Sequence, residues 1–201
     1  MENEKSYLAL GDSYTVGESV DAEKTWPVQL VNFLKKNKVE VGTPKIIATT
    51  GWTTNELISA IKEENINKEF DLVSLLIGVN NQYRGYPIDQ YKKEFEELLQ
   101  ISIIYANDDP SKVFVLSIPD YGVTPFASER NPEKIGKELD EYNAIAEAIC
   151  KQYKVCFFDI TPISKNAKND PELVADDGLH PSGKMYMEWV DLIWKDVFKM
   201  I

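Results

Sequence analysis

Short apolar segments alternate with amphipathic segments along this chain, and this alternation constrains the fold more than any other feature. Strand-sized apolar runs are expected at residues 7–10, 45–48, 72–77, 113–118 and 155–158. Between them apolar residues recur at helical spacing, as in Ile135, Leu139, Tyr142, Ala146 and Ile149. Strands that alternate with helices are typical of a parallel sheet with right-handed crossovers and helices on both faces. We therefore expect a three-layer α/β/α protein with a five-stranded parallel sheet.

The size and charge of the chain exclude several classes of protein. With 201 residues, we expect a single domain over residues 1–201. The 22 Lys and Arg residues are outnumbered by 33 Asp and Glu residues, so the net charge is −11. This balance argues against a nucleic-acid partner, which requires clustered cations. No apolar run approaches the roughly 18 residues that span a bilayer, so stable membrane insertion is not expected.

The amino-terminal segment and the cysteines indicate a compartment. Residues 1–5 lack the basic start and apolar stretch of a secretion signal. We therefore expect a cytoplasmic protein, or a secreted or periplasmic one if a leader preceded this sequence. Cys150 and Cys156 form no zinc-binding pattern, and we expect two buried, reduced thiols.

Residues suited to catalysis follow three of the expected strands. Ser13 lies on a tight turn after the first strand, Gly51 follows the second, and Asn80 follows the third. In parallel sheets, reactive groups gather at these carboxyl ends. Each residue also has an ordinary explanation, as a helix cap, a turn glycine or a turn asparagine.

The last segment of interest contains His180, the only histidine in the chain. His180 precedes Pro181, which suits the first turn of the last helix. Asp177, three residues upstream, can reach an imidazole nitrogen. A serine hydroxyl becomes nucleophilic when a neutral imidazole takes its proton and a carboxylate orients that imidazole. Ser13, His180 and Asp177 could therefore act together, with fixed N–H donors for the oxyanion.

The ordered set of these motifs resembles the four blocks of the SGNH (GDSL) hydrolases. The matching segments are Gly11-Asp12-Ser13, Gly51, Gly78-x-Asn80 and Asp177-x-x-His180. The resemblance runs over nearly the whole chain and implies a flavodoxin-like three-layer fold with a shallow, open site. It also implies serine hydrolysis of esters or thioesters with no metal and no cofactor, on a small-molecule ester substrate.

The resemblance also implies a role for each matching residue. Ser13 corresponds to the nucleophile, His180 to the base and Asp177 to the carboxylate that orients the base. The oxyanion hole corresponds to the Ser13 N–H, Gly51 and the Asn80 amide.

Three departures from the family pattern bear on the site. Tyr14 replaces a leucine, which indicates a packing change. Asn81 stands where many members have an aspartate that supports the loop, so the local geometry can differ here. Trp52 is bulky and can wall the acyl pocket. With Tyr83 and Tyr86 near the rim, it can stack against a sugar, or these rings can simply pack within their loops.

We expect a serine esterase that hydrolyses esters of short-chain acyl groups, for example acetyl esters, including those of a sugar. The reason is that the sequence contains no long apolar insertion that could form an acyl tunnel. A lysophospholipase or an acyl thioesterase is the alternative within the family. A non-catalytic binding module with the same fold is the alternative of another class. A metal site among Asp12, Asp176, Asp177 and His180 is a further alternative, which activity in the presence of a chelator would eliminate. The oligomeric state is not predicted.

Overall fold

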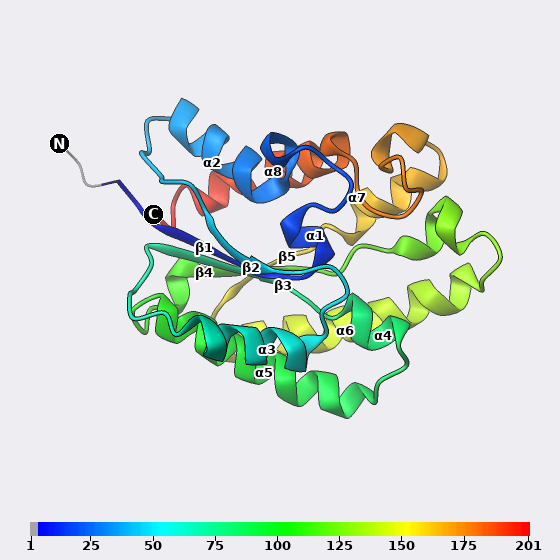
Figure 1. Ribbon diagram of the computed structural model, residues 1–201, viewed down its shortest axis with the longest axis horizontal. Coiled ribbons are helices and arrows are strands. Elements are labelled where there is room, and N and C mark those ends of the chain that lie inside the picture. Colours follow the sequence, from blue (N-terminus) through cyan, green and yellow to red (C-terminus); the bar gives the residue numbers. More distant parts are fainter. Residues whose placement is uncertain (1–3) are drawn as a thin grey trace.

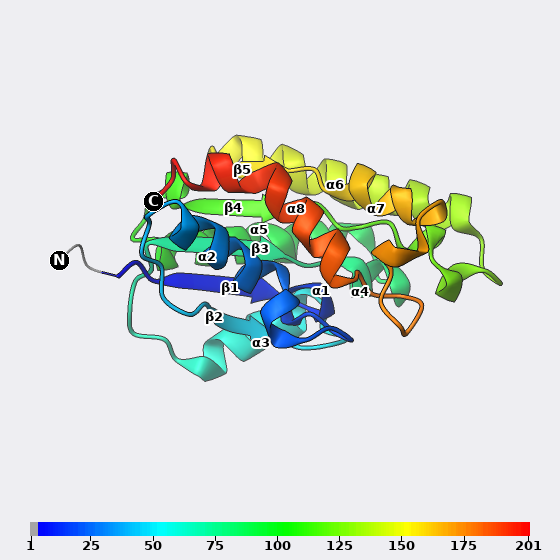
Figure 2. The ribbon, with the colours of Figure 1, turned by 90° about the horizontal axis from the view of Figure 1, so that it is seen from above.

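Five parallel strands form one sheet at the centre of the molecule, in the order β2-β1-β3-β4-β5 (Figure 1 and Figure 2). The structure is a computed structural model that describes residues 4–201. The strands are β1 (Tyr7–Gly11), β2 (Lys45–Ala48), β3 (Leu72–Leu76), β4 (Val113–Leu116) and β5 (Cys156–Phe158). All four pairings are parallel, so the expected sheet is confirmed.

Helices cover both faces of this sheet. The α-helices are α1 (Ser13–Val16), α2 (Trp26–Lys36), α3 (Thr54–Glu64), α4 (Val79–Tyr83), α5 (Ile88–Tyr105), α6 (Pro132–Tyr153), α7 (Thr161–Lys165) and α8 (Gly183–Val197). The helices α2 and α8 lie together on one face, and α3, α5 and α6 lie on the other (Figure 1). Short 3₁₀ turns are at Ala22–Lys24, Pro110–Lys112, Tyr121–Val123, Pro125–Ala127, Asn166–Lys168 and Pro171–Leu173. The three-layer α/β/α prediction is therefore confirmed.

Apolar residues bury the sheet from both sides. The strands β1, β3 and β4 are buried along their whole length, which explains their continuous apolar sequences. On α2, Leu30 and Leu34 have no exposed surface, and each stabilises the fold by about 1.5–3 kcal/mol. Of the two cysteines, which are both free, Cys150 is buried but Cys156 is only half-buried, because β5 is the edge strand.

The amino-terminal ends of α3 and α8 position the loops at the carboxyl end of the sheet. At α3 the expected capping box is present, and the Thr53 N–H donates to Glu56 Oε2 at 2.8 Å. The last helix differs from the expectation, because Ser182 is its N-cap and Pro181 lies outside it. Pro181 instead forms an isolated antiparallel bridge with Val174. His180 is therefore held by a small backbone loop rather than by a helical turn.

Candidate active site

Ser13 is presented by a sharp turn between β1 and α1. Asp12 is the N-cap of α1, and its Oδ1 accepts from the Tyr14 N–H at 3.1 Å. Ser13 is the first helical residue, so its own N–H points out of the helix end. This N–H has no acceptor among residues 4–201. The turn thus offers a hydroxyl and an unpaired N–H at the same residue.

The Asp12 side chain is fully buried beneath this turn. Its Oδ2 atom has no hydrogen-bond partner among the described residues. Burial raises the pKa of Asp12 to about 7, against the lowering effect of the hydrogen bond from Tyr14. The carboxyl group is therefore neutral in mildly acidic solution, unlike an ordinary surface aspartate.

Asp177 and His180 face each other across a tight loop. The imidazole Nδ1 lies 2.6 Å from Asp177 Oδ2, so the predicted pairing of these two residues is present. The other oxygen, Oδ1, accepts from the backbone N–H groups of Leu179 and His180, both at 2.9 Å. The Tyr14 ring and the imidazole form an edge-type aromatic pair, with their centroids 5.9 Å apart. The imidazole is thus fixed in orientation, and its Nε2 has no hydrogen-bond partner among residues 4–201.

Ser19 is a further residue of this cluster that the sequence analysis does not identify. Its Oγ donates to Asp177 Oδ2 at 2.7 Å, across 158 residues of sequence. Burial alone would raise the pKa of Asp177, but hydrogen bonds from His180, Leu179 and Ser19 outweigh it and hold the pKa well below its usual range. Ser19 has a φ of 63°, which is unusual for a residue with a side chain. A serine in a loop carries no sequence signal for this contact.

The loops after β2 and β3 meet beside Ser13. Asn80 lies on α4, and its amide Nδ2 donates to the Trp52 carbonyl at 2.9 Å, which leaves its second N–H unpaired among the described residues. Gly51 has a φ of 86°, where a side chain would be strained. The Gly51 N–H has no acceptor within residues 4–201, and Arg84 Nη2 holds the Gly51 carbonyl at 2.6 Å. Both predicted donors therefore have an N–H group without an acceptor within the described residues.

Gly78 explains why α4 can start so close to the core. Its φ is 130°, and a Cβ built on it would lie 2.6 Å from Tyr91, which is too close for any side chain. The Gly-x-Asn spacing therefore places Asn80 by allowing this close approach.

Asn81 supports the site by linking α4 to α3. It is fully buried, its Oδ1 accepts from the Thr54 N–H at 3.0 Å, and its Nδ2 lies 2.7 Å from Thr54 Oγ1. An aspartate could accept here but could not donate. The amide therefore satisfies both groups of Thr54, and the departure from the family pattern keeps the loop anchored.

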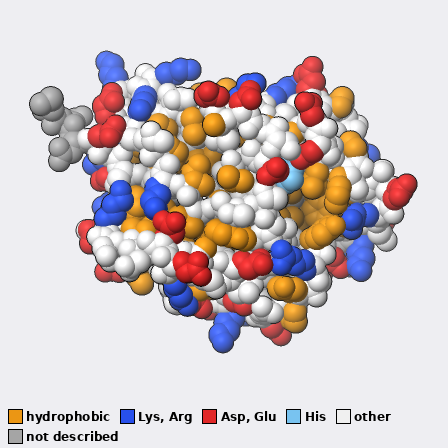
Figure 3. Space-filling model, viewed as in Figure 1, with side chains coloured by type: hydrophobic (Ala, Val, Ile, Leu, Met, Phe, Trp, Pro, Cys, Tyr) orange, Lys and Arg blue, Asp and Glu red, His pale blue; other side chains and the backbone are white. Residues whose placement is uncertain are grey.

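A small cavity of about 190 Å³ joins these parts. Its lining includes Ser13, Asn80 and His180, and three rings that we call the aromatic wall, Tyr83, Tyr121 and Phe126. The ring centroids of the wall are 6.2–6.4 Å apart, which is contact distance for aromatic pairs. Figure 3 shows the single histidine, in pale blue, at the edge of a hollow lined by hydrophobic side chains. The base and the hydroxyl thus share one cavity with the wall.

The remaining residues predicted for the rim lie elsewhere. Trp52 is half-buried and packs against the core, and Tyr86 is half-buried with its carbonyl accepting from the Tyr142 hydroxyl at 3.3 Å. Neither of them, nor Gly51, is among the described residues that line the cavity. Of the three rim aromatics, only Tyr83 belongs to the cavity.

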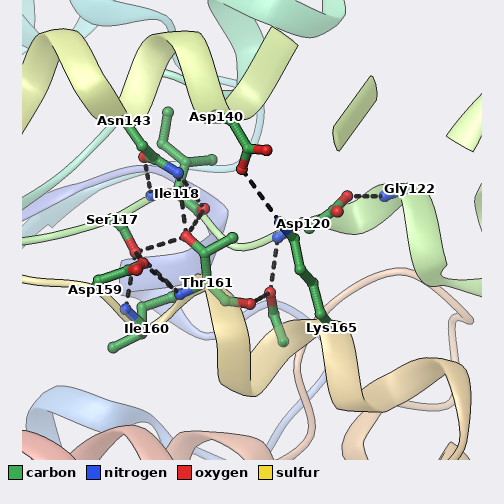
Figure 4. Close-up of polar contacts among 11 residues, drawn as sticks. Ser117, Ile118, Asp120, Gly122, Asp140, Asn143, Asp159, Ile160, Thr161 and Lys165 are labelled. Carbon is green, nitrogen blue, oxygen red and sulfur yellow. Dashed lines mark hydrogen bonds and ion pairs between the residues drawn. The ribbon is translucent and has the colours of Figure 1, made fainter. Parts of the chain in front are cut away.

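A buried polar network holds the base of the aromatic wall in the loop after β4 (Figure 4). Asn143 on α6 accepts from the Ile118 N–H at 2.7 Å and donates to the Ile118 carbonyl at 3.0 Å. Two residues later, Asp120 accepts from the Gly122 N–H at 2.8 Å. These bonds fix the backbone on both sides of Tyr121, so this ring has a rigid base.

The family of the chain follows from sequence comparison. The family model described as "GDSL-like Lipase/Acylhydrolase family" matches residues 9–187. The chain belongs to the GDSL-like lipase/acylhydrolase family. An arylesterase of Vibrio mimicus is 27% identical to this hydrolase over 179 residues, which cover 87% of this chain and 78% of the relative. An acetylxylan esterase of Geobacillus stearothermophilus is 24% identical over 190 residues, which cover 90% and 78%.

Solved structures confirm the predicted SGNH fold of this GDSL-family hydrolase. The crystal structure of TesA has a TM-score of 0.77 at 16% identity and covers 98% of this chain and 100% of that one. The acetylxylan esterase Axe2 of Geobacillus stearothermophilus has a TM-score of 0.72 at 19% identity, over 96% and 94%. As a family member, the chain is a carboxylic-ester hydrolase. No helix within residues 4–201 is both long and apolar enough to cross a bilayer.

Proposed function

We propose that this hydrolase cleaves short-chain carboxylic esters, including acetyl esters of sugars, through an acyl-enzyme on Ser13. The observation that carries this proposal is the small size of the cavity that Ser13, His180 and Asn80 share. Its 190 Å³ correspond to about six water molecules, well below the roughly 300–1,000 Å³ of pockets for drug-sized ligands. An acetyl group fits such a space, whereas a long acyl chain would extend beyond it.

The acylation step uses the free nitrogen of the imidazole. Ser13 Oγ attacks the ester carbonyl carbon while His180 Nε2 takes the hydroxyl proton. Asp177 keeps the Nδ1 proton in place through its 2.6 Å contact and stabilises the imidazolium that forms. The C–O bond to the alcohol then breaks, and the imidazolium returns the proton to the departing oxygen.

The deacylation step repeats this chemistry with water. His180 Nε2 takes a proton from a water molecule, whose oxygen attacks the acyl carbon on Ser13. The bond to Ser13 Oγ breaks, and the imidazolium returns the proton to that oxygen. The products are a carboxylic acid and the original serine.

The negative charge on the tetrahedral intermediates is matched by three donors. In this proposal they are the Ser13 N–H, the Gly51 N–H and the second N–H of the Asn80 amide, all unpaired within the described chain. Fixed donors of this kind typically contribute about 10²–10³ each to turnover.

A panel of p-nitrophenyl esters from acetyl to palmitoyl tests the proposal, with a parallel set of acetylated sugars. We expect kcat/KM to fall sharply beyond butyryl, and Ser13→Ala to abolish turnover of every member. Leu192→Ala, at an exposed position on α8 that is not among the described residues lining the cavity, is the control. A preference for palmitoyl would favour a lysophospholipase or thioesterase instead, and parent activity in Ser13→Ala would refute the acyl-enzyme.

A further inference from the structure

The arginines of this chain are unusual in number and in place. Among the 22 cationic residues only Arg84 and Arg130 are arginine. Both line a second hollow, of about 420 Å³, which adjoins the catalytic cavity and shares Tyr83 and Tyr121 with it. In a chain with a net charge of −11, both guanidinium groups therefore lie beside one end of the active site.

Arg130 is held in a fixed position by the aromatic wall. Its guanidinium carbon lies 5.0 Å from the Tyr83 ring centroid and 4.8 Å from that of Phe126, and Nη2 donates to the Tyr83 hydroxyl at 3.0 Å. The guanidinium has five N–H donors, and the hydrogen bond to Tyr83 uses one of them. No carboxylate lies within 4.0 Å of Arg130 among residues 4–201. Its remaining donors have no anionic partner in the described chain.

The other cations of the hollow are already neutralised. Arg84 Nη1 lies 3.3 Å from Glu56 Oε1, and Arg84 also holds the Gly51 carbonyl. Lys134 Nζ lies 3.6 Å from Glu138 Oε1. Arg130 is therefore the excess positive charge of this hollow.

The amino-terminal end of α6 adds to this positive character. The helix has 22 residues, and it begins at Pro132, directly after the Asn131 cap that lines the hollow. Such an end carries a partial positive charge. Figure 3 shows Lys and Arg side chains, in blue, beyond the hydrophobic hollow beside the histidine.

We propose that this second hollow is a subsite for an anionic group, a carboxylate or a phosphate, carried by the ester substrate. The ester lies in the catalytic cavity, the connecting atoms cross Tyr83 and Tyr121, and Arg130 receives the anion through its edge N–H groups. A planar guanidinium matches both anions in the same bidentate geometry. This inference rests on the proposed function, because it requires the ester bond to be bound at Ser13.

The test compares esters that differ only in charge. Acetate esters of ω-hydroxy acids with two, four and six carbons are each paired with the corresponding carboxamide, and kcat/KM is measured for both. An acetylated four-carbon phosphate distinguishes a phosphate from a carboxylate. The readout is the ratio of kcat/KM for the anion to that for the neutral partner, because a change in folding or in the wall affects both substrates alike.

Arg130→Gln is the decisive variant, and Lys137→Gln is its control. Lys137 is exposed on α6, outside the hollow, and its replacement changes the net charge by the same one unit. We expect Arg130→Gln to lower the ratio by about three- to tenfold for at least one chain length, since a charge-assisted hydrogen bond at a partly exposed site is lost. Lys137→Gln should change it by less than twofold.

An unchanged ratio at every length would overturn the inference. An equal loss on anion and amide would also overturn it, because Arg130 would then only prop the aromatic wall. If no ester of either kind is hydrolysed, the proposed function fails instead. Calorimetric binding of the six-carbon anion to Ser13→Ala, with and without Arg130→Gln, then decides the inference without turnover: weaker binding in the double variant supports it, and equal binding refutes it.

Discussion

The two sides of the catalytic cavity are built in different ways. On the catalytic side, Asp177 receives hydrogen bonds from two backbone N–H groups, from His180 and from Ser19. The base is fixed by a turn of four residues, and the nucleophile by a helix start. On the side of the aromatic wall, the rings contact each other and Arg130, and Tyr83 and Phe126 are 46% and 39% exposed. The catalytic side is held by directional bonds. On the other side only the buried Tyr121 has a hydrogen-bonded base, and Tyr83 and Phe126 stack at the surface.

This difference separates chemistry from specificity. Proton transfer depends on atoms within hydrogen-bond distance, so small displacements of the catalytic side cost much activity. The exposed rings of Tyr83 and Phe126 can change the groups that they contact without unfolding the protein. We therefore expect substitutions on the catalytic side to lower turnover of every ester, and substitutions on the wall to change the choice among esters.

Asp177→Asn breaks the catalytic side most severely. The amide cannot hold the Nδ1 proton as a carboxylate does, so the imidazole loses its orientation and its stabilised cation. We expect kcat/KM for p-nitrophenyl acetate to fall by about 10³–10⁴ with the fold intact. Asp176→Asn, at an exposed neighbour, is the control and should change activity by less than twofold. A loss below tenfold in Asp177→Asn would contradict the assigned role.

Asn80→Ala tests the helix on which the two sides meet, since α4 carries both Asn80 and Tyr83. Loss of the amide donor should lower kcat by about 10²–10³ with little change in KM. Asn80→Asp keeps the shape but presents an anion, so it should be at least as damaging. If Asn80→Asp retained parent activity, Asn80 would not be an oxyanion donor.

Ser19→Gly sharpens the comparison on the catalytic side, because it removes only the outermost bond to Asp177. Loss of this exposed hydrogen bond should lower kcat by about three- to tenfold. Glycine accepts the φ of 63° without strain, so Tm should not fall, whereas Ser19→Ala should lose activity and stability together. Thermal unfolding measured beside kcat separates the two effects, and unchanged kcat in both variants would show that Ser19 has no part in positioning Asp177.

Asp12→Asn has the smallest expected effect on turnover, and its main effect is on stability. In the native protein the pKa of Asp12 is raised from 3.8 to about 7, so the folded state binds its proton more tightly than the unfolded state. The contribution of protonated Asp12 to the stability of the parent is therefore fully present below about pH 4 and is lost as the pH rises from 4 to 7. The amide does not titrate, so the variant should gain relative to the parent over this window by at most about 1.4 kcal/mol per pH unit.

Urea unfolding at pH 4.5, 6 and 7.5 measures this gain. A difference in unfolding free energy that stays constant from pH 4.5 to 7.5 would contradict a raised pKa for Asp12.

The sequence alone was sufficient for the sheet, the main helices and the close pairing of His180 with Asp177. These features depend on the periodicity of hydrophobic residues and on contacts between residues three positions apart, and both can be recognised in the sequence alone. The predicted start of the last helix was wrong, because Pro181 pairs with Val174 through a bridge that local sequence patterns do not encode. The contact of Ser19 with Asp177 spans 158 residues, and no pattern in the chain announces it.

The aromatic wall shows the same limit on the other side of the cavity. Tyr83 was expected at the rim with Trp52 and Tyr86, but the other rings of the wall are Tyr121 and Phe126, from the loop after β4. Which exposed ring meets which depends on how two loops pack, and hydrophobic period does not specify this packing. The hydrogen bond from Arg84 to the Gly51 carbonyl likewise joins two loops, and no local sequence pattern predicts it.

Covalent labelling by a fluorophosphonate measures the central claim most directly, since Ser13 is activated only when His180 can take its proton. Mass spectrometry of the labelled peptides identifies the site, and the labelling rate is compared between the parent and His180→Ala. We predict a single modification on Ser13 in the parent and a rate at least about 10³-fold lower in His180→Ala. Modification at another residue, or equal rates in the two proteins, would contradict the account.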